Sequence, residues 1–243
     1  MAHGVFTDAK VLIDGYDFSG DHNALALDFG VDAVEDTNFG DTTHIFLGGL
    51  ELTEATLEGA ADHGNATVEG RHFGNVGVAD TLMTLGPEGA DDGEIAYVLK
   101  ALSASYSPGA SIGELLRFTV RANMSGDRLI RGTVMHNATR TSSGNGTARQ
   151  LGAVSATQKV YVALHVIATV SGTSPTLDVI VQSDNASGMS SPTSRVTMTQ
   201  KTALGSEMKS TAGAITDDWW RVNYTIGGSS TPTFPFIVTV GIR

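Results

Sequence analysis

Residues 11–59 constrain the fold most, because apolar residues recur there in three short stretches separated by polar turns. The stretches are residues 11–16, 24–29 and 50–57, and each mixes apolar with small or polar residues at close to every second position. Alternation with this period is typical of β-strands that bury one face. The segment therefore predicts three strands, and it contains no recognisable catalytic motif.

The composition extends this prediction to the rest of the chain. Of the 243 residues only 17% are charged and 7% aromatic, while 29 are glycine. Such a profile, together with abundant Thr, Ser, Ala and Val, is typical of a turn-rich β protein rather than a helical enzyme. We predict a mainly β fold, an antiparallel β-sandwich with one short helix, followed by a second β-sandwich-like region at the C-terminal end.

The chain divides most naturally at residues 137–150, which are rich in Thr, Ser, Gly and Asn and lack apolar periodicity. We predict an acidic β domain at 1–136, a linker or long loop at 137–150 and a second β region at 151–243. The strands expected after residue 150 form either a second sandwich or strands that complete the first one. The short helix is predicted at residues 76–85, ended by Gly86 and Pro87.

Charge is divided unevenly between the two halves. Residues 1–126 carry a formal charge of −15 and residues 127–243 carry +4, within a net charge of −11. One interpretation is chance drift in surface composition. The other is functional: the acidic half repels polyanions, or the acidic face of one subunit meets the basic face of the next.

No arrangement of residues predicts catalysis, and we expect no enzyme activity and no cofactor. The chain has neither a Gly-x-Ser-x-Gly elbow nor a phosphate-binding glycine loop. Its Lys and Arg residues are too few and dispersed to predict specific nucleic-acid binding.

No metal site is predicted either. Asp14, Asp17 and Asp21 lack the ligand spacing and closing Glu of an EF-hand. His63 and His72 flank a turn, where histidines usually bind nothing, and no histidine pair has the spacing of a zinc-protease helix.

Trp219 and Trp220 are the only tryptophans and open a predicted strand after Asp217 and Asp218. Neighbours in a strand face opposite sides, so one indole is expected in the core and the other on the outer face. An exposed Trp beside polar residues is also how sugar-binding proteins stack on a pyranose ring. The alternative function is therefore a decoration or receptor- and carbohydrate-binding module that uses Trp219 or Trp220.

We expect no membrane segment, because no run of about 18 apolar residues occurs and the first ten residues lack the pattern of a secretory signal. The chain has no cysteine, which fits synthesis in a reducing cytoplasm, although many extracellular assemblies also lack cysteine.

Three short motifs give the chain a resemblance to a known family. They are Leu12-Ile13-Asp14-Gly15-Tyr16-Asp17-Phe18-Ser19, Phe39-Gly40-Asp41-Thr42-Thr43 and Phe46-Leu47-Gly48-Gly49-Leu50. In this order they resemble the amino-terminal half of the tail tube (major tail) proteins of long-tailed bacteriophages. Where the common pattern has a Pro and a Lys near the third motif, this chain has Gly48 and Glu51.

The resemblance implies a virion protein that oligomerises into stacked rings, contacts other tail proteins and lets DNA pass without binding it. On this basis the expected subunit contacts are Phe39, Gly40, Asp41, Thr42 and Thr43. The acidic residues expected to face the channel are Asp32, Glu35, Asp36, Glu51, Glu54 and Glu58.

Overall fold

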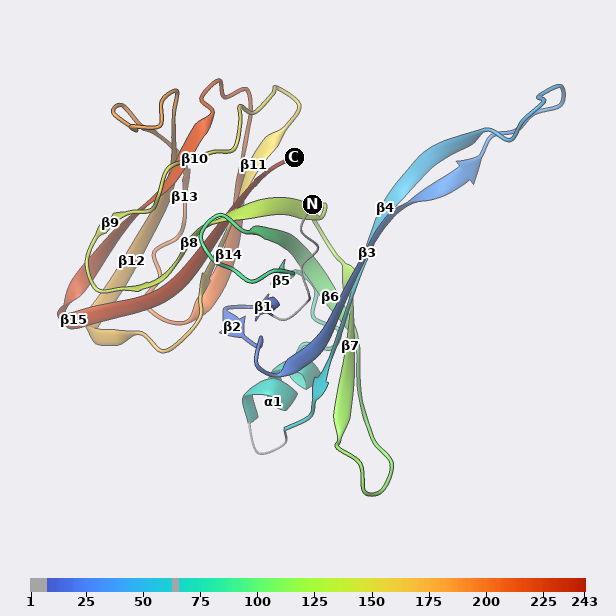
Figure 1. Cartoon of the computed structure of the whole chain (residues 1–243), viewed down its shortest axis with the longest axis horizontal. Helices are drawn as coiled ribbons and strands as arrows, with labels where there is room; N and C mark the ends of the chain where they lie inside the picture. Colours follow the sequence, from blue (N-terminus) through green and yellow to red (C-terminus); the bar gives the residue numbers. More distant parts are fainter. Residues whose placement is uncertain (1–7, 63–65) are drawn as a thin grey trace. The chain divides into compact units, whose positions relative to one another are not determined.

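The computed structural model describes residues 8–62 and 66–243 and is mainly β, as predicted (Figure 1). The sheet is largely antiparallel, and the described residues contain one short helix. That helix has nine residues, and no helix of the described part is long and apolar enough to cross a membrane.

The fold consists of two compact units. Unit 1 comprises residues up to Gly20, 82–98 and 130–243, and unit 2 comprises residues 21–81 and 99–129. These boundaries differ from the predicted division into 1–136 and 151–243. Residues 137–150 lie within unit 1, because the end of β8 (Ile130–Arg140) pairs with the last strand of the chain, where Arg140 faces Phe234. Partners so distant in sequence leave no local signal.

Unit 1 is organised around the 24-residue strand β15 (Trp219–Ile242). The other strands of unit 1 are β1 (Lys10–Ile13), β2 (Tyr16–Asp17), most of β5 (Thr81–Gly86), the start of β6 (Ile95–Gly109), β8, β9 (Gly144–Asn145), β10 (Arg149–Gln150), β11 (Lys159–Val166), β12 (Ser171–Asp184), β13 (Thr193–Thr197) and β14 (Gly205–Ala212). The first half of β15 pairs with β9, β10 and β12, and the second half pairs with β8 and β11. Between the halves, Gly228, Ser230 and Thr231 take positive φ, which breaks the regular strand.

The core of unit 1 lies between the two groups of strands that share β15. Buried residues of β11, such as Val162 and Leu164, belong to the same apolar cluster as Val179 of β12 and Val222 of β15. β-branched residues pack well on pleated surfaces, and two such surfaces face to face form a sandwich. Two smaller clusters lie elsewhere in unit 1, one around Leu12 and Val134 and the other around Leu82 and Ile130.

The predicted helix at 76–85 is wrong. Residues Thr81–Gly86 form β5, which pairs with β1 and is buried at all six positions. A strand buried on both faces shows a continuous apolar run, which periodicity alone does not distinguish from a buried helix. The helix of the described chain is α1 (Ala66–Gly74), with Glu69 in its first turn and Arg71 in its last, as the helix dipole favours.

Unit 2 is a four-stranded sheet in the order β3, β4, β7, β6, with α1 on one face. Its strands are β3 (His22–Glu35), β4 (Phe46–Ala60), β7 (Arg117–Met124) and residues 99–109 of β6. His72 of α1 is buried and stacks against Tyr106 of β6 and Phe118 of β7, with ring centroids 6.2 and 5.3 Å apart. Burial, with a smaller effect of nearby His22, lowers the pKa of His72 to about 3, so its imidazole is neutral.

Candidate functional site: an exposed apolar arm

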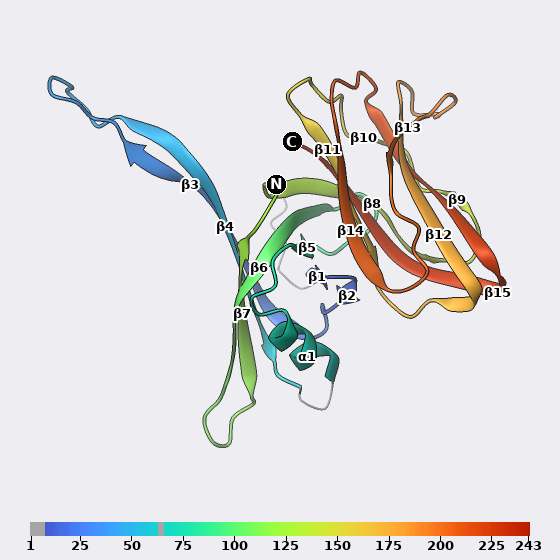
Figure 2. The same ribbon diagram turned by 180° about the vertical axis from the view of Figure 1, so that it is seen from behind.

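The β3–β4 hairpin of unit 2 continues well past the strands that flank it. β4 pairs with β7 only from Glu54 to Ala60, whereas β3 and β4 remain paired from Phe29 opposite Thr53 to Glu35 opposite Phe46. We call residues 29–53 the arm. Figures 1 and 2 show from two sides that this part of the hairpin has no other strand of unit 2 beside it.

The end of the arm is fixed by its own hydrogen bonds. The Asp36 amide donates to the carbonyl of Ile45 at 2.8 Å, and the Asn38 amide donates to the Asp41 carboxylate at 2.7 Å. Gly40 takes a φ of 106°, a conformation that glycine adopts without steric cost. Within the predicted contact segment 39–43, Gly40 and Asp41 therefore shape the turn, and the Phe39 side chain is fully exposed.

Large apolar side chains lie on the arm and are exposed in the part of the chain that the structure describes. Leu50 is 80% exposed, and eight more large apolar side chains of the arm are also exposed. They are Phe29, Val31, Val34, Phe39, Ile45, Phe46, Leu47 and Leu52. Directly opposite residues share a face, so Val34 and Leu47 lie on one face while Phe46, opposite Glu35, lies on the other. The arm is thus apolar on both faces.

Exposed large apolar side chains are few in the rest of the described chain. The remaining exposed large apolar side chains are Phe73, Val76, Val78, Ile112 and Leu115. Together with those of the arm, every exposed large apolar side chain of residues 8–62 and 66–243 belongs to unit 2. Monomeric proteins rarely expose large contiguous apolar patches, and such patches usually mark binding surfaces. Unit 2, and the arm above all, is therefore the candidate interaction surface.

The six predicted channel-facing carboxylates do not share one surface. Glu54 and Glu58 alternate with the buried Ala55 and Leu57, so they lie on the sheet face away from α1. Glu51 lies on the other face and pairs with Arg128 at 3.5 Å. Asp32, Glu35 and Asp36 belong to the arm.

The face that carries Glu54 and Glu58 is mixed in sign. Arg121 lies opposite Thr56 and Arg117 lies opposite Ala60, so both arginines share this face, and an Arg121 nitrogen lies 3.9 Å from the Glu54 carboxylate. Counting charges along the sequence missed these arginines, because only the register of β7 against β4 brings them beside the carboxylates.

The two tryptophans differ in burial, as expected for neighbours in a strand. Trp220 is fully buried, and its Nε1 donates to the carbonyl of Gly152 at 2.9 Å. Trp219 is half-buried. Asp217 accepts hydrogen bonds from Ser183 and Arg195, and Asp218 accepts one from Gln150. A sugar site at this position would depend on Trp219, and it stays a prediction.

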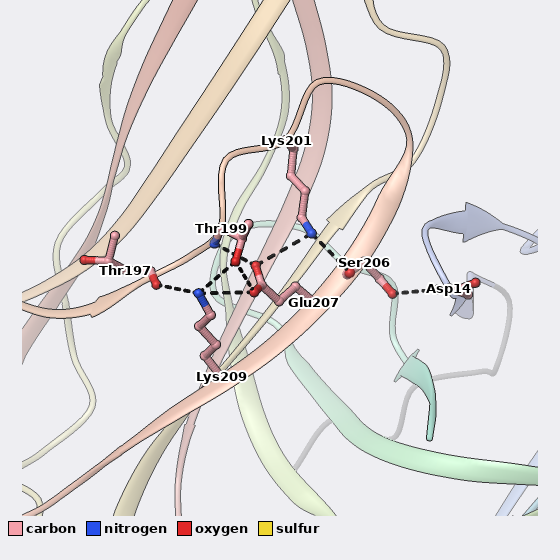
Figure 3. Close-up of polar contacts among 7 residues, drawn as sticks. All are labelled: Asp14, Thr197, Thr199, Lys201, Ser206, Glu207 and Lys209. Atoms are coloured by element: carbon pink, nitrogen blue, oxygen red, sulfur yellow. Dashed lines mark hydrogen bonds and ion pairs between the residues drawn. The ribbon is translucent and has the colours of Figure 1, made fainter. Parts of the chain in front are cut away.

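A polar cluster of unit 1 surrounds Glu207 (Figure 3). The Glu207 carboxylate accepts hydrogen bonds from the amide and hydroxyl of Thr199, at 2.8 and 2.6 Å, and contacts Lys209 at 3.2 Å and Lys201 at 3.6 Å. Partial burial raises the pKa of Glu207, but these partners lower it to a net value below the usual range. The Glu207 carboxylate is fully engaged by Thr199 and the two lysines, which indicates a structural role.

The aspartates considered for calcium have partners of their own. Asp14 accepts a hydrogen bond from Ser206 at 3.0 Å, as Figure 3 also shows, and Asp17 pairs with Lys10 at 2.6 Å. Of the other residues considered for metal, His72 is buried among aromatic rings and His63 lies outside the described residues. Within the described residues no three His, Asp or Glu side chains lie together as metal ligands.

Comparisons with known proteins give distant similarities. No family model matches the chain, and no curated protein matches it. A chain from the virion of a native gene transfer agent particle aligns with 13% identity and a TM-score of 0.40, over 50% of this chain and 94% of that chain.

Two further solved structures are similar at the same level. The SPP1 Dit protein, described as a paradigm of the hub adsorption apparatus of phages that infect Gram-positive hosts, aligns with 12% identity and a TM-score of 0.40, over 98% of this chain and 100% of that one. A chain of the PVC sheath-tube complex, from an extracellular contractile injection system, aligns with 15% identity and a TM-score of 0.41, over 54% and 91%. Similarities of this size assign the chain to no family.

Proposed function

We propose that this protein is a structural subunit of a bacteriophage tail tube, made in the host cytoplasm, which assembles with copies of itself into stacked rings and becomes part of the virion. The observation that carries the proposal is the arm, a hairpin with nine exposed large apolar side chains on both faces. The tail tube resemblance of the motifs at residues 12–19, 39–43 and 46–50 supplies the kind of assembly.

The physical reason for assembly is the cost of leaving the arm in water. Burying apolar surface is worth about 25 cal/mol per Å², so covering several Leu, Val and Phe side chains contributes many kcal/mol towards association. The side chains that gain most are the exposed ones, and among the described residues they concentrate on the arm. Assembly therefore proceeds through the arm, and other tail proteins would contact the ends of the tube.

The channel of the tube is proposed to be lined by the sheet face that carries Glu54 and Glu58. A net charge of −11 repels DNA phosphates over the whole molecule. Arg117 and Arg121 lie on the same face, and Glu54 next to Arg121 offsets one of these positive charges. The expected result is a surface along which DNA moves without being held.

Electron microscopy of the purified protein tests the proposal directly. Negative staining should show rings or tubes, and light scattering should show large species whose amount rises with protein concentration. Leu50→Asp combined with Leu52→Asp should abolish them, because two carboxylates then lie within the apolar arm. The circular dichroism spectrum should be unchanged, since neither leucine belongs to the buried core.

A matched control carries the same two added charges elsewhere. Ala153→Asp combined with Ala156→Asp places them at exposed positions of unit 1, and this variant should assemble like the unmodified protein. A protein that remains monomeric at high concentration, or an arm variant that forms normal tubes, contradicts the proposal.

A further inference from the structure

A second exposed apolar surface lies at the edge of the unit 2 sheet opposite to β3. Residues 73–79, Phe-Gly-Asn-Val-Gly-Val-Ala, comprise the last two residues of α1 and the turn after it, and they carry no charged side chain. We call them the 73–79 strip. Phe73 is 70% exposed and Val76 is 43% exposed, and Val78 is exposed as well.

The strip is held in a defined position beside β6. The Gly77 amide donates to the carbonyl of Ser103 at 2.9 Å, and Val76 and Ser103 form a parallel bridge. The Val78 amide donates to the carbonyl of Asn75 at 2.9 Å, which fixes the turn. The strip is thus an ordered part of unit 2 that presents apolar side chains outward.

The opposite edge is the long strand β3, which pairs only with β4 among the strands of the described chain. Its register is regular from Ala24 to Val31, and this segment contains no Pro and a single charged residue, Asp28. Natural edge strands are usually shortened, charged with Lys or interrupted by Pro, because an open edge recruits another chain. An edge left open in this way is typical of a strand that is covered in an assembly.

The strip and the middle of β3 lie at the same position along the strand direction, at opposite edges of the sheet. One row of neighbouring residues runs from Leu27 of β3 through Ala55, Ala122 and Ser103 to Val76 of the strip. Phe29 is two residues further along β3, about 7 Å by strand geometry. A copy placed beside this one in the plane of the sheet therefore brings its strip level with Leu27 and Phe29.

The negative charge of the arm favours a contact with the 73–79 strip over a contact with a second arm. The arm contains five carboxylates, Asp32, Glu35, Asp36, Asp41 and Glu51, and no Lys or Arg. Arg128 pairs with Glu51 from outside the arm, so the arm keeps a net negative charge. A symmetric contact between two arms would bring these like charges together, which is unfavourable. The strip is uncharged, and unit 1 shows no exposed large apolar side chain among its described residues.

We propose that the β3 edge and the base of the arm of one copy pack on the 73–79 strip of the next copy, with Phe29 against Val76. This contact rests on the proposed self-assembly and names its two surfaces. Because the surfaces differ, each copy offers one and receives the other, and such head-to-tail contacts close into rings when the rotation between copies permits.

Cysteine crosslinking tests the contact, because the chain has no cysteine of its own. Three variants are treated with a short bismaleimide and run on denaturing gels: Phe29→Cys, Val76→Cys and the double variant. The double variant should give a ladder of covalent oligomers. A mixture of the single variants should give dimers and nothing larger, and each single variant alone should stay monomeric. Phe29→Cys combined with Ala156→Cys is the matched control and should give no ladder.

Light scattering on the same samples distinguishes a wrong contact surface from a lack of self-assembly. Dimers from Phe29→Cys alone would show a symmetric contact between arms and overturn the inference. Normal assembly of the double variant without a ladder would overturn the 73–79 strip as the contact surface and leave the proposed function standing. A protein that never assembles would refute both. A further variant, Val76→Glu, should stay folded and lose its rings.

Discussion

The Nε2 atom of His165 and the hydroxyl oxygen of Thr84 lie 2.9 Å apart in the interior of unit 1. On the other side of the ring, the Gly15 amide donates to Nδ1 at 3.3 Å. Nδ1 must therefore be unprotonated, and Nε2 carries the hydrogen that it donates to Thr84. Both ring nitrogens are satisfied by the neutral imidazole, and burial lowers the pKa of His165 to about 3.

We predict that the protein loses stability as the pH falls below 6.5. The unfolded chain binds a proton at His165 near pH 6.5, whereas the folded chain binds it only near pH 3. The unfolded state is therefore favoured increasingly as the pH falls from 6.5 to 3. His72, at about 3, and His136, at about 4, add to the effect. Each histidine contributes about 1.4 kcal/mol per pH unit within its window.

Urea unfolding at pH 7.5, 6 and 5 checks this prediction. His165→Gln should lower stability at every pH and reduce the dependence on pH by about one proton. Ala156→Ser, at an exposed position of unit 1 without an ionisable group, should keep the dependence of the unmodified protein. An unchanged slope in the His165 variant would contradict the role assigned to this histidine.

Glycines 59 and 30 should respond differently to alanine. A Cβ at Gly59 would lie 2.1 Å from the carbonyl oxygen of Asp21 and 2.7 Å from the ring of Phe118, so the sheet must distort. Gly59→Ala should cost about 1–3 kcal/mol or more. A Cβ at Gly30 meets nothing within 4 Å, so Gly30→Ala should change stability by less than about 1 kcal/mol. Equal melting temperatures for the two variants would contradict this prediction.

Two phenylalanines of unit 2 should separate assembly from folding. Phe118 is buried against His72 and Tyr106, so Phe118→Ala should destabilise unit 2 by about 3–5 kcal/mol. Phe39 at the end of the arm has no apolar cover, so Phe39→Ala should leave the melting temperature unchanged and weaken assembly. Calorimetry and light scattering on both variants measure the two effects, and loss of stability in the Phe39 variant would be the opposite result.

The tryptophans allow a similar comparison in unit 1. Trp220→Phe leaves the Gly152 carbonyl without its indole donor and removes buried volume, at a cost of about 1–3 kcal/mol. Trp219→Phe should cost less than about 1 kcal/mol, because that side chain is only half-buried. Denaturant unfolding measures both costs. Fluorescence titration of the Trp220→Phe variant with glycans tests Trp219 alone, and saturable quenching would favour the carbohydrate-binding alternative.

The sequence predicted what depends on local pattern. Alternation located the strands around Leu25 and Leu57, and the neighbour rule placed one of Trp219 and Trp220 in the core. The helix was misplaced because the buried run at residues 81–86 has no period that separates a strand from a helix.

Long-range pairing was beyond the reach of local pattern. Nothing near Arg140 indicates that it pairs with Phe234, so the division of the chain into units followed from the register alone. The contact segment was likewise predicted around Phe39, whereas the exposed apolar surface extends over the whole arm, because exposure depends on which strands end early.

The strand β15 also sets the order in which the units can form during synthesis. Every strand that builds unit 2 lies between residues 22 and 124, so the ribosome has released all of them while the end of the chain is still being made. Unit 1 cannot close its core until residues 219–242 emerge, since β8, β11 and β12 all pair with them. Contacts so distant in sequence form slowly. The nascent chain therefore exposes a completed arm before its other unit is folded, which makes premature association a hazard that expression at low temperature or with chaperones should relieve.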